Sequence, residues 1–344
     1  MTNYALLHDP RRSPHSGRRQ AGVPVIKLSV IVPFYNLQTL APQTLRNLAR
    51  AADPEVEFLL IDDCSTDDTL AVLNAGVDKV RNARVIAKPR NSGLSATRNV
   101  GLDEATGEYL TFFDGDDFVS PTYFRDLLDE ICRRKVDMVR TDHVQVEGRI
   151  RRIQRVPNGF RGGLIGVPRD AILPVDRSSS VDYPYAWAGI YHRRLLDAGL
   201  LHFREDLRTC EDRPWIWNLH LKAESMVSVS NLGIFYRRDV VNSLSRIGDT
   251  KQLDFFKAFD SIVADVSDDV DADLLLPKAL RTYASLICFH LDNTERYDPP
   301  IALTLRDMSA EHLQQLPRAE LGRVMADMDE GRQKILNGLL TGGQ

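Results

Sequence analysis

The sequence predicts an α/β fold in which helices flank a mostly parallel central sheet, followed by a helical region at the C-terminal end. Short β-branched, apolar runs alternate with stretches of helical periodicity about every 25 residues in the first third of the chain, a pattern typical of a parallel sheet. After about residue 250, apolar residues recur at intervals of three and four, which indicates amphipathic helices.

The first four strands are expected at 27–33, 57–61, 84–87 and 109–113. The first run, KLSVIVP, is almost continuously hydrophobic, as parallel strands covered on both faces are. Helices are expected between the strands, over Leu40 to Ala49, from near Asp67, and over 94–104. Ligands of parallel sheets bind at the carboxyl ends of the strands. Because polar clusters follow three of these strands, we expect the clusters to meet at one edge of the sheet.

Length and composition limit the classes of function. A chain of 344 residues is long enough for two domains, and 43% hydrophobic and 27% charged residues are typical of a packed protein. The formal net charge of −4 excludes a chain-wide cationic field for binding nucleic acid, so no such partner is expected. The four cysteines are far apart in the sequence, which argues against a disulfide framework and favours a reducing cytosol.

Residues 1–24 are polar, basic and rich in Pro, Gly and Ser, and we expect them to form a disordered tail. They lack the apolar core of a secretory signal, and no apolar run approaches the roughly 18–20 residues of a membrane span. A basic tail either stays solvated or docks on anionic lipid head groups, and both interpretations stay open. The resulting expectation is a cytoplasmic protein, with peripheral contact to the inner face of the membrane as a further option.

An acidic cluster, Asp114-Gly115-Asp116-Asp117, follows the fourth strand. Gathered carboxylates repel one another unless a cation neutralises them, and Mg²⁺ is typically held by one or two carboxylates together with substrate phosphates. Gly115 would let the backbone approach a ligand closely. The alternative is a polar turn in which Asp117 caps a following helix.

Two further clusters carry candidate site residues. Asp62 and Asp63 end the second strand, where one of them could accept a hydrogen bond from a nucleobase imide; the alternative is a loop that caps the next helix. Arg98 lies in the helix after Asn91-Ser92-Gly93. It could hold a phosphate together with backbone N–H groups, or form an ion pair with one of the acids.

Glu211 and Asp212 precede Arg213-Pro214-Trp215. Proline is common in the first turn of a helix, so Asp212 is a candidate N-cap residue. The alternative is a general base at the edge of a cleft, which takes a proton from a hydroxyl group.

Five motifs occur in one order over roughly residues 27–246, and together they resemble the family 2 inverting glycosyltransferases of the GT-A fold. The motifs are Pro33-Phe34-Tyr35-Asn36, Asp62-Asp63-Cys64-Ser65-Thr66-Asp67, Asn91-x-Gly93 with Arg98-Asn99, Asp114-x-Asp116-Asp117 and Glu211-Asp212. The resemblance implies a Rossmann-like catalytic domain over 25–249, in which 25–120 holds the nucleotide sugar and 121–249 the acceptor. Residues 250–344 would form the helical C-terminal region.

The resemblance also implies a role for each matching position. Asp212 would be the catalytic base, Asp116 would bind the metal, and Glu211 would support the metal or the acceptor site. Asp63 or its neighbour Asp62 would face the nucleobase, Asp114 would face the ribose, and Arg98 would contact the diphosphate or the nucleobase. The full set expected at the nucleotide sugar is Pro33, Tyr35, Asn36, Asp62, Asp63, Asn91, Arg98, Asp114 and Gly115.

Two positions depart from the family pattern. Cys64 stands where the family often has glycine, which could alter the turn. The segment that begins at Tyr236 lacks a histidine that many relatives use to hold the metal or the diphosphate. Here Asp239 could serve as a metal ligand, or Arg237 and Arg238 could hold the leaving group.

The implied function is transfer of a sugar from a nucleotide-diphosphate sugar, UDP-linked by the resemblance alone, to an acceptor hydroxyl. The transfer would invert the anomeric configuration and use Mn²⁺ or Mg²⁺. We expect a bacterial cell-surface polysaccharide or polyol phosphate as acceptor. Trp187 is a candidate for stacking on its sugar ring, although such residues are more often part of the core.

The C-terminal helices have no chemistry that the sequence identifies. They would cover the acceptor groove, form a homo-oligomer or rest on a membrane, and packing onto the catalytic domain is the default expectation. Two other functions stay open: a scaffold or docking protein that keeps a nucleotide-sugar-binding domain, and a metal-dependent phosphatase. The phosphatase is disfavoured because its Asp-x-Asp pair would end the first strand rather than the fourth.

Overall fold

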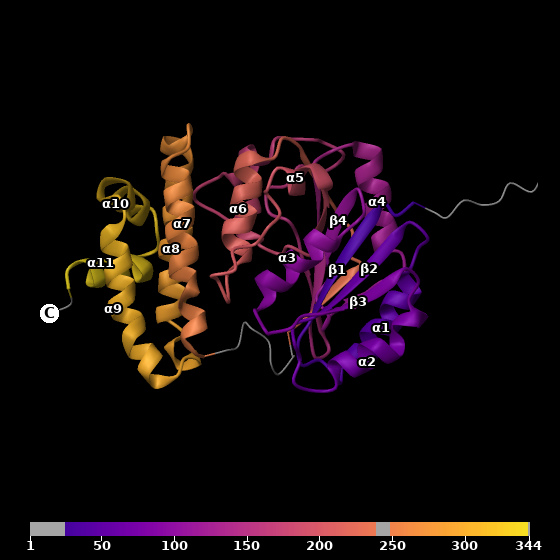
Figure 1. Cartoon of the computed structure of the whole chain (residues 1–344). Coiled ribbons are helices and arrows are strands. Elements are labelled where there is room, and N and C mark those ends of the chain that lie inside the picture. The colour runs from indigo at the N-terminus through magenta and orange to yellow at the C-terminus, as the bar shows by residue number, and fades with distance from the viewer. Residues whose placement is uncertain (1–24, 239–247, 343–344) are drawn as a thin grey trace, which may run out of the picture.

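The computed structural model describes residues 25–238 and 248–342, and a seven-stranded sheet forms its centre (Figure 1). The strands lie in the order β10 (Met226–Val229), β6 (Met138–Thr141), β9 (Gly189–His192), β4 (Tyr109–Phe112), β1 (Leu28–Phe34), β2 (Val56–Asp62) and β3 (Ala83–Ala87). All neighbours are parallel except β9, which is antiparallel to both β4 and β6. The expected mostly parallel sheet is confirmed.

β1 and β2 are buried along their whole length, as their continuous hydrophobicity predicts. They pair in parallel from Leu28 opposite Val56 to Phe34 opposite Asp62, so both strands end at the same level. β4 pairs with the other side of β1. The four strands expected from the sequence are present with boundaries shifted by one residue.

Helices lie on both sides of the sheet (Figure 1). One side carries α1 (Ala41–Ala51), α2 (Thr69–Gly76) and α4 (Tyr123–Arg134), and the other carries α3 (Leu94–Glu104), α5 (Arg193–Asp197) and α6 (Asp212–Lys222). Trp215 of α6 packs edge-on against Phe112 and Tyr191 of the sheet. Short 3₁₀ helices occur at η1 (Val77–Lys79), η2 (Pro168–Ile172), η3 (Ser180–Asp182), η5 (Thr250–Leu253) and η6 (Thr294–Arg296).

A second, four-stranded sheet was not among the elements expected from the sequence. Its order is β5 (Phe118–Val119), β11 (Ile234–Arg237), β7 (His143–Glu147) and β8 (Ile150–Gln154). β5 directly follows the acidic cluster and pairs with β11. The second sheet therefore brings residues 234–238 beside Asp116 and Asp117.

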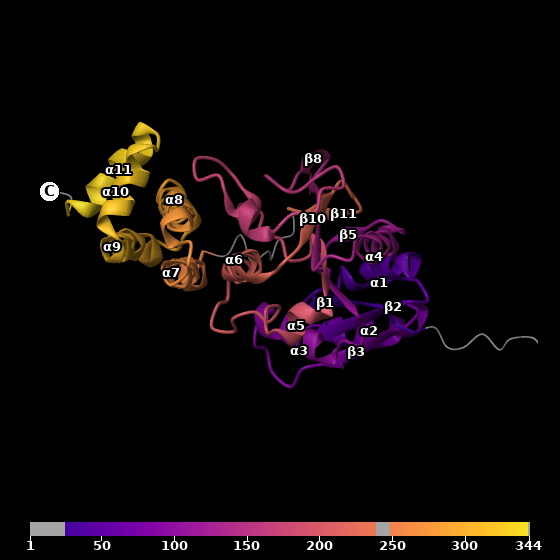
Figure 2. The ribbon, with the colours of Figure 1, turned by 90° about the horizontal axis from the view of Figure 1, so that it is seen from above.

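The chain from residue 254 to residue 340 is helical, in agreement with its apolar periodicity. It forms α7 (Asp254–Ser267), α8 (Ala272–Leu291), α9 (Pro299–Gln315), α10 (Arg318–Ala326) and α11 (Glu330–Leu340). α7 lies next to α6, and α9 to α11 lie farther from the sheet (Figures 1 and 2). Phe255, Phe259 and Tyr283 are among the buried residues that join α7 to α8.

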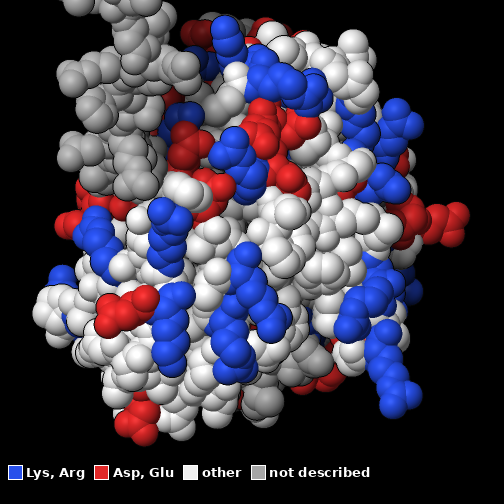
Figure 3. All heavy atoms as spheres, turned by 90° about the vertical axis from the view of Figure 1, so that its right-hand side faces the viewer, with Lys and Arg blue, Asp and Glu red and all other residues white. Residues whose placement is uncertain are grey.

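The surface carries both signs of charge. Figure 3 shows the side that is on the right in Figure 1, where Lys and Arg side chains are spread widely and Asp and Glu side chains gather in the upper part. Within residues 25–238 and 248–342, no helix has the length and hydropathy of a membrane-spanning segment. The expected basic tail, residues 1–24, lies outside the described residues.

Candidate active site

The polar clusters that follow β1, β2 and β4 meet at one edge of the sheet, as predicted. The Asp63 amide donates to the Phe34 carbonyl (2.9 Å), and the Asn36 amide donates to Ser65 Oγ (3.0 Å). The Gly115 carbonyl, after β4, accepts a hydrogen bond from Thr44 of α1 (2.6 Å). These bonds join the loop after β1 to the loop after β2, and they attach the loop after β4 to α1.

Two residues of these loops have left-handed backbone conformations. Asn36 has φ +52°, and its side chain accepts a hydrogen bond from the Thr66 amide (2.8 Å). Cys64 has φ +56°, a conformation that glycine adopts without strain, which explains why glycine suits this position in the family pattern. Tyr35 is 47% exposed and presents its ring to the solvent at the end of β1.

Gly115 has a structural reason to be glycine. A Cβ atom there would lie 2.9 Å from the Phe34 ring and 2.9 Å from the Pro33 carbonyl oxygen. The end of β1 therefore packs directly against Gly115. This packing already explains the glycine, so a ligand that approaches its backbone closely is not needed.

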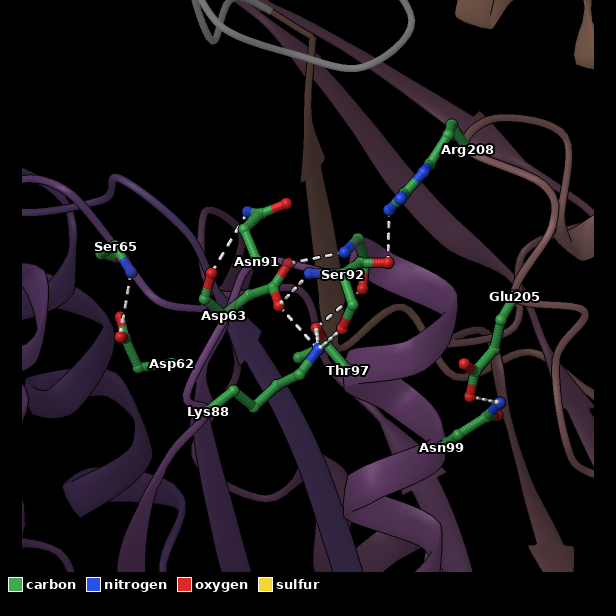
Figure 4. Close-up of polar contacts among 11 residues, drawn as sticks. Asp62, Asp63, Ser65, Lys88, Asn91, Ser92, Thr97, Asn99, Glu205 and Arg208 are labelled. Carbon is green, nitrogen blue, oxygen red and sulfur yellow. Dashed lines mark hydrogen bonds and ion pairs between the residues drawn. The ribbon is translucent and has the colours of Figure 1, made fainter.

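Asp63 organises the loop before α3 (Figure 4). Its Oδ1 accepts hydrogen bonds from Lys88 Nζ (2.6 Å) and the Ser92 amide (3.0 Å), and its Oδ2 accepts one from the Gly93 amide (2.8 Å). Asn91 donates to the Asp63 carbonyl (3.2 Å). A carboxylate offers about four acceptor positions, so one position on Oδ2 is left for a further donor.

Lys88 is a site residue that the sequence reasoning missed. It follows β3 directly, and it is mostly buried. Its three N–H groups donate to Asp63, to Ser92 Oγ and to Thr97 Oγ1 (2.9 Å) (Figure 4). Lys88 could have been predicted from its position, because it follows the carboxyl end of a parallel strand, as the other candidate residues do.

Asp62 has a different environment from Asp63. Its Oδ2 accepts a hydrogen bond from the Ser65 amide (3.0 Å), which closes the turn after β2. Its Oδ1 is buried and has no hydrogen-bond partner in the described part of the chain. Asp62 is 1% exposed and Asp63 is 4% exposed, so burial does not choose between the two candidates for contact with the nucleobase.

Arg98 connects the acidic cluster to α6. The guanidinium donates to Asp114 Oδ1 (2.9 Å) and to Glu211 Oε1 (2.9 Å), and it is almost fully buried between the Phe112 and Phe203 rings. The ion-pair interpretation of Arg98 is therefore confirmed for Asp114. The same residue places Glu211, and Asp212 next to it, beside the acidic cluster.

Asp117 does not cap a helix, because β5 follows it. Its buried carboxylate accepts a hydrogen bond from the Arg237 amide (2.7 Å), and the Arg237 side chain donates to the Asp116 carbonyl. This capping alternative is wrong. The two contacts fix the turn that holds the Asp116 side chain.

The Asp116 carboxylate forms no hydrogen bond or ion pair with another residue within 25–238 and 248–342. Burial and the charge of Asp114 raise the pKa of Asp116 to about 6. A hard divalent cation that uses one or two carboxylates and substrate phosphates fits this oxygen ligand. No group of three or more His, Cys, Asp or Glu side chains in the described residues forms a complete metal site, and Asp239 lies outside those residues.

Asp212 is the first residue of α6, and Glu211 makes no capping hydrogen bond. No hydrogen bond or ion pair from another described residue holds the Asp212 carboxylate. Burial, with the charge of Glu211 as a second cause, raises the pKa of Asp212 to about 7. A carboxylate with this pKa can accept a proton near neutral pH.

The expected stacking role of Trp187 needs correction. The side chain is only 4% exposed and packs against His143, Tyr185 and Tyr236, with ring centroids 4.8, 5.0 and 5.3 Å away. Because these contacts cover the indole ring, it has no free face for a sugar. Tyr185 is less buried and is a candidate for contact with an acceptor.

Comparisons with known proteins show what the chain is similar to. The model of the family described as glycosyl transferase family 2 matches residues 29–196. An uncharacterised glycosyltransferase of Bacillus subtilis, EpsJ, is 28% identical over 64% of this chain and 63% of its own length. The poly(ribitol-phosphate) β-N-acetylglucosaminyltransferase TarS of Staphylococcus aureus is 30% identical over 62% of this chain and 35% of its own. The chain thus spans less than two thirds of the length of these relatives.

Solved structures show the fold. The complex of S. aureus TarS 1–349 with UDP-GlcNAc superposes with a TM-score of 0.68 at 22% identity, covering 92% of this chain and 93% of that one. The mannosyltransferase PcManGT of Pyrobaculum calidifontis, in complex with GDP-Man and Mn²⁺, has a TM-score of 0.52 at 17% identity, covering 92% and 85%. The chain has the GT-A fold, and its residues 29–196 are similar to glycosyl transferase family 2.

Proposed function

We propose that the protein transfers a sugar from a nucleotide-diphosphate sugar to an acceptor hydroxyl by a single, inverting displacement. The observation that carries the proposal is the position of Arg98, which joins Asp114 to Glu211. Arg98 thereby connects the candidate donor site at the strand ends with Asp212, the candidate catalytic base at the start of α6. We assign the transferase domain to residues 25–249, with the donor in its first half.

The hydrogen bonds of Asp63 favour a donor whose nucleobase has an imide N–H. The ionised carboxylate has one acceptor position left and can donate nothing. Uracil and guanine present an N–H at the middle of their pairing edge, whereas cytosine presents a ring nitrogen that accepts. The relatives crystallised with UDP-GlcNAc and GDP-Man both carry such a base, and we propose UDP because TarS is the more similar of the two.

A metal fits the acidic cluster. Asp116 would hold Mn²⁺ or Mg²⁺ together with the donor diphosphate, and the bound ion would offset the charge that develops on the leaving diphosphate. Asp117 and Arg237 hold the Asp116 turn in place. Arg98 holds Asp114 at the same edge by its direct ion pair of 2.9 Å.

Asp212 would act as the general base. It removes the proton of the acceptor hydroxyl while that oxygen forms a bond to the anomeric carbon, and the bond from this carbon to the diphosphate oxygen breaks on the opposite face. One displacement inverts the anomeric configuration. The pKa of Asp212, raised by burial to about 7, makes the carboxylate a stronger base than an exposed aspartate.

The acceptor is proposed from the relatives. TarS is named for glycosylation of poly(ribitol phosphate), and a Bacillus spizizenii relative is named a poly(ribitol-phosphate) β-glucosyltransferase. We therefore propose a polyol-phosphate chain or a related cell-surface glycan, glycosylated in the cytoplasm or at the inner face of the membrane.

One experiment tests the proposed reaction. The purified chain is incubated with UDP-GlcNAc, UDP-glucose, GDP-mannose and CDP-ribitol, each with Mn²⁺ and with EDTA, and the released nucleotide is measured with and without a poly(ribitol phosphate) acceptor. We expect metal-dependent UDP release from a UDP-sugar. Release of inorganic phosphate from simple phosphomonoesters, with no nucleotide released, would support the phosphatase instead.

A further inference from the structure

The segment that leads to the candidate base is held from two sides. We define the base loop as residues 203–212, which lie between α5 and α6 and end at the first residue of α6. Its end contains Cys210, whose φ of +58° is a left-handed conformation that costs a non-glycine residue roughly 1–2 kcal/mol. The conformation persists only where surrounding contacts fix it.

The first set of contacts comes from α3 on the donor side (Figure 4). Asn99 exchanges two hydrogen bonds with the backbone of Phe203 (2.8 and 2.9 Å) and donates to Glu205 (3.0 Å). Ser95 Oγ donates to the Leu207 carbonyl (3.2 Å), and Arg208 donates to the Ser92 carbonyl. The base loop is thereby attached to the helix that also carries Arg98.

The second set comes from the C-terminal helices. The Arg208 amide donates to Asp254 Oδ2 at 2.6 Å, and Thr209 Oγ1 donates to the Lys251 carbonyl at 2.6 Å. Thr209 and Asp254 are both buried. These two bonds fix consecutive residues of the base loop immediately before Cys210. They come from η5 and from the first residue of α7, which packs on α6.

These contacts matter because the Asp212 carboxylate has no hydrogen bond or ion pair from another residue in the described part of the chain. Among the described residues, polar contacts therefore reach Asp212 only through its backbone, and that backbone belongs to the base loop. We infer that η5 and α7 are part of the catalytic apparatus: through Thr209 and Asp254, the C-terminal region positions Asp212. Thr209 and Asp254 are positioning residues, and the inference rests on the proposed role of Asp212 as base.

Matched variants test this inference. Thr209→Val removes the hydroxyl donor at nearly constant shape, and Asp254→Ala removes the acceptor. Thr209→Ser and Asp254→Asn keep a donor and an acceptor, respectively. Lys334→Met is the control in the C-terminal region, because Lys334 is exposed on α11 and takes part in none of the contacts to the base loop.

Two readouts are measured in each variant: hydrogen–deuterium exchange of the amides of residues 208–212, and kcat and KM for the donor. In Thr209→Val and Asp254→Ala we expect about tenfold faster exchange and a kcat lower by about 10- to 100-fold. The KM for the donor should stay within about twofold. Thr209→Ser and Asp254→Asn should restore most of the lost kcat, and Lys334→Met should behave as the unaltered chain.

The outcomes separate this inference from the proposed function. Full kcat in Thr209→Val and Asp254→Ala, with the unaltered chain active, would overturn the inference and leave the function intact. An equal loss in the conservative variants would also overturn it, since the hydrogen bonds would then not be the cause. If the unaltered chain turns over no nucleotide sugar, the proposed function fails. The exchange measurement still tests the inference in that case, because unchanged exchange at 208–212 in Thr209→Val and Asp254→Ala would show that the C-terminal helices do not hold the base loop.

Discussion

Arg98 and Glu211 form a buried ion pair of 2.9 Å although they are 113 positions apart in the chain. Arg98 uses its other terminal nitrogen for Asp114, so one guanidinium connects the two halves of the candidate site. The planar fork of arginine can serve two carboxylates at once, which the single ammonium group of lysine does less well.

Removal of this guanidinium should cost stability and activity together. Arg98→Met leaves Glu211 buried without its cation, and we expect a loss of about 3–5 kcal/mol in the free energy of unfolding. The double variant Arg98→Met/Glu211→Gln should recover part of that loss, because the unpaired charge is gone, but no activity. Urea unfolding and donor turnover measure the two effects. If the double variant is less stable than Arg98→Met alone, the ion pair is not what Arg98 contributes.

Asp116 should control the metal dependence of donor binding. In Asp116→Asn the metal loses its protein carboxylate, so calorimetry should show UDP binding that is weak and insensitive to EDTA. In the unaltered chain, EDTA should weaken UDP binding by about tenfold or more, which corresponds to at least about 1.4 kcal/mol. The exposed Asp206, in the base loop, provides the control variant Asp206→Asn. Equal sensitivity to EDTA in Asp116→Asn and the control would exclude Asp116 as the ligand.

Lys88 should set the preference for the base through Asp63. Lys88→Met removes the ammonium group that neutralises and orients the carboxylate, and one charge-assisted hydrogen bond is worth about 1.5–3 kcal/mol. We expect UDP to bind about tenfold more weakly or worse, with a smaller preference for UDP over CDP. Competition calorimetry with UDP and CDP measures both quantities. Lys79→Met, at an exposed lysine of η1, is the matched control; an unchanged ratio of UDP to CDP affinity in Lys88→Met would contradict the proposed role.

The sequence predicted those parts of the molecule that depend on short segments. The strands β1, β2 and β4 are marked by local apolar runs, and their polar ends share one edge because parallel strands share a direction. The second sheet could not be predicted in the same way. All residues of β8 except Gln154 are exposed, so no alternation of buried and exposed residues marks this strand.

The details of the site depend on contacts between distant segments. Whether Asp62 or Asp63 is available to a ligand depends on Lys88 and on the amides before α3, which only the folded chain places together. Trp187 carries no local sign of burial, because its neighbours His143 and Tyr236 come from β7 and β11. The contacts of Thr209 with Lys251 and of Asp254 with Arg208 likewise form only through the packing of the C-terminal helices.

His220 should make the protein sensitive to mild acid. Its Nδ1 donates to the Ile216 carbonyl (2.8 Å), its Nε2 is buried without a partner in the described residues, and burial lowers its pKa to about 3. Between about pH 6.5 and pH 3 the unfolded chain binds the proton that the folded chain rejects, so this contribution to stability is lost as the pH falls. From pH 7 to pH 5 the loss amounts to about 2 kcal/mol.

Urea unfolding at pH 7 and pH 5 measures this loss. His220→Leu should show a smaller decrease between the two pH values, whatever its stability at pH 7, because leucine binds no proton. A decrease of the same size in both proteins would show that other groups cause the acid sensitivity.

Asp212 should act as a base with its own pH signature. Asp212→Asn keeps the shape of the side chain and removes its basicity, so we expect a loss of about 10²–10⁴ in the transfer rate with donor binding preserved. Burial raises the pKa of Asp212 to about 7, and only the deprotonated form can take the proton. In the unaltered chain kcat/KM should therefore fall about tenfold for each pH unit below 7. An aspartate of ordinary pKa would instead keep its activity to about pH 5. A flat profile from pH 7 to pH 5, or near-normal turnover in Asp212→Asn, would move the role of base to another residue.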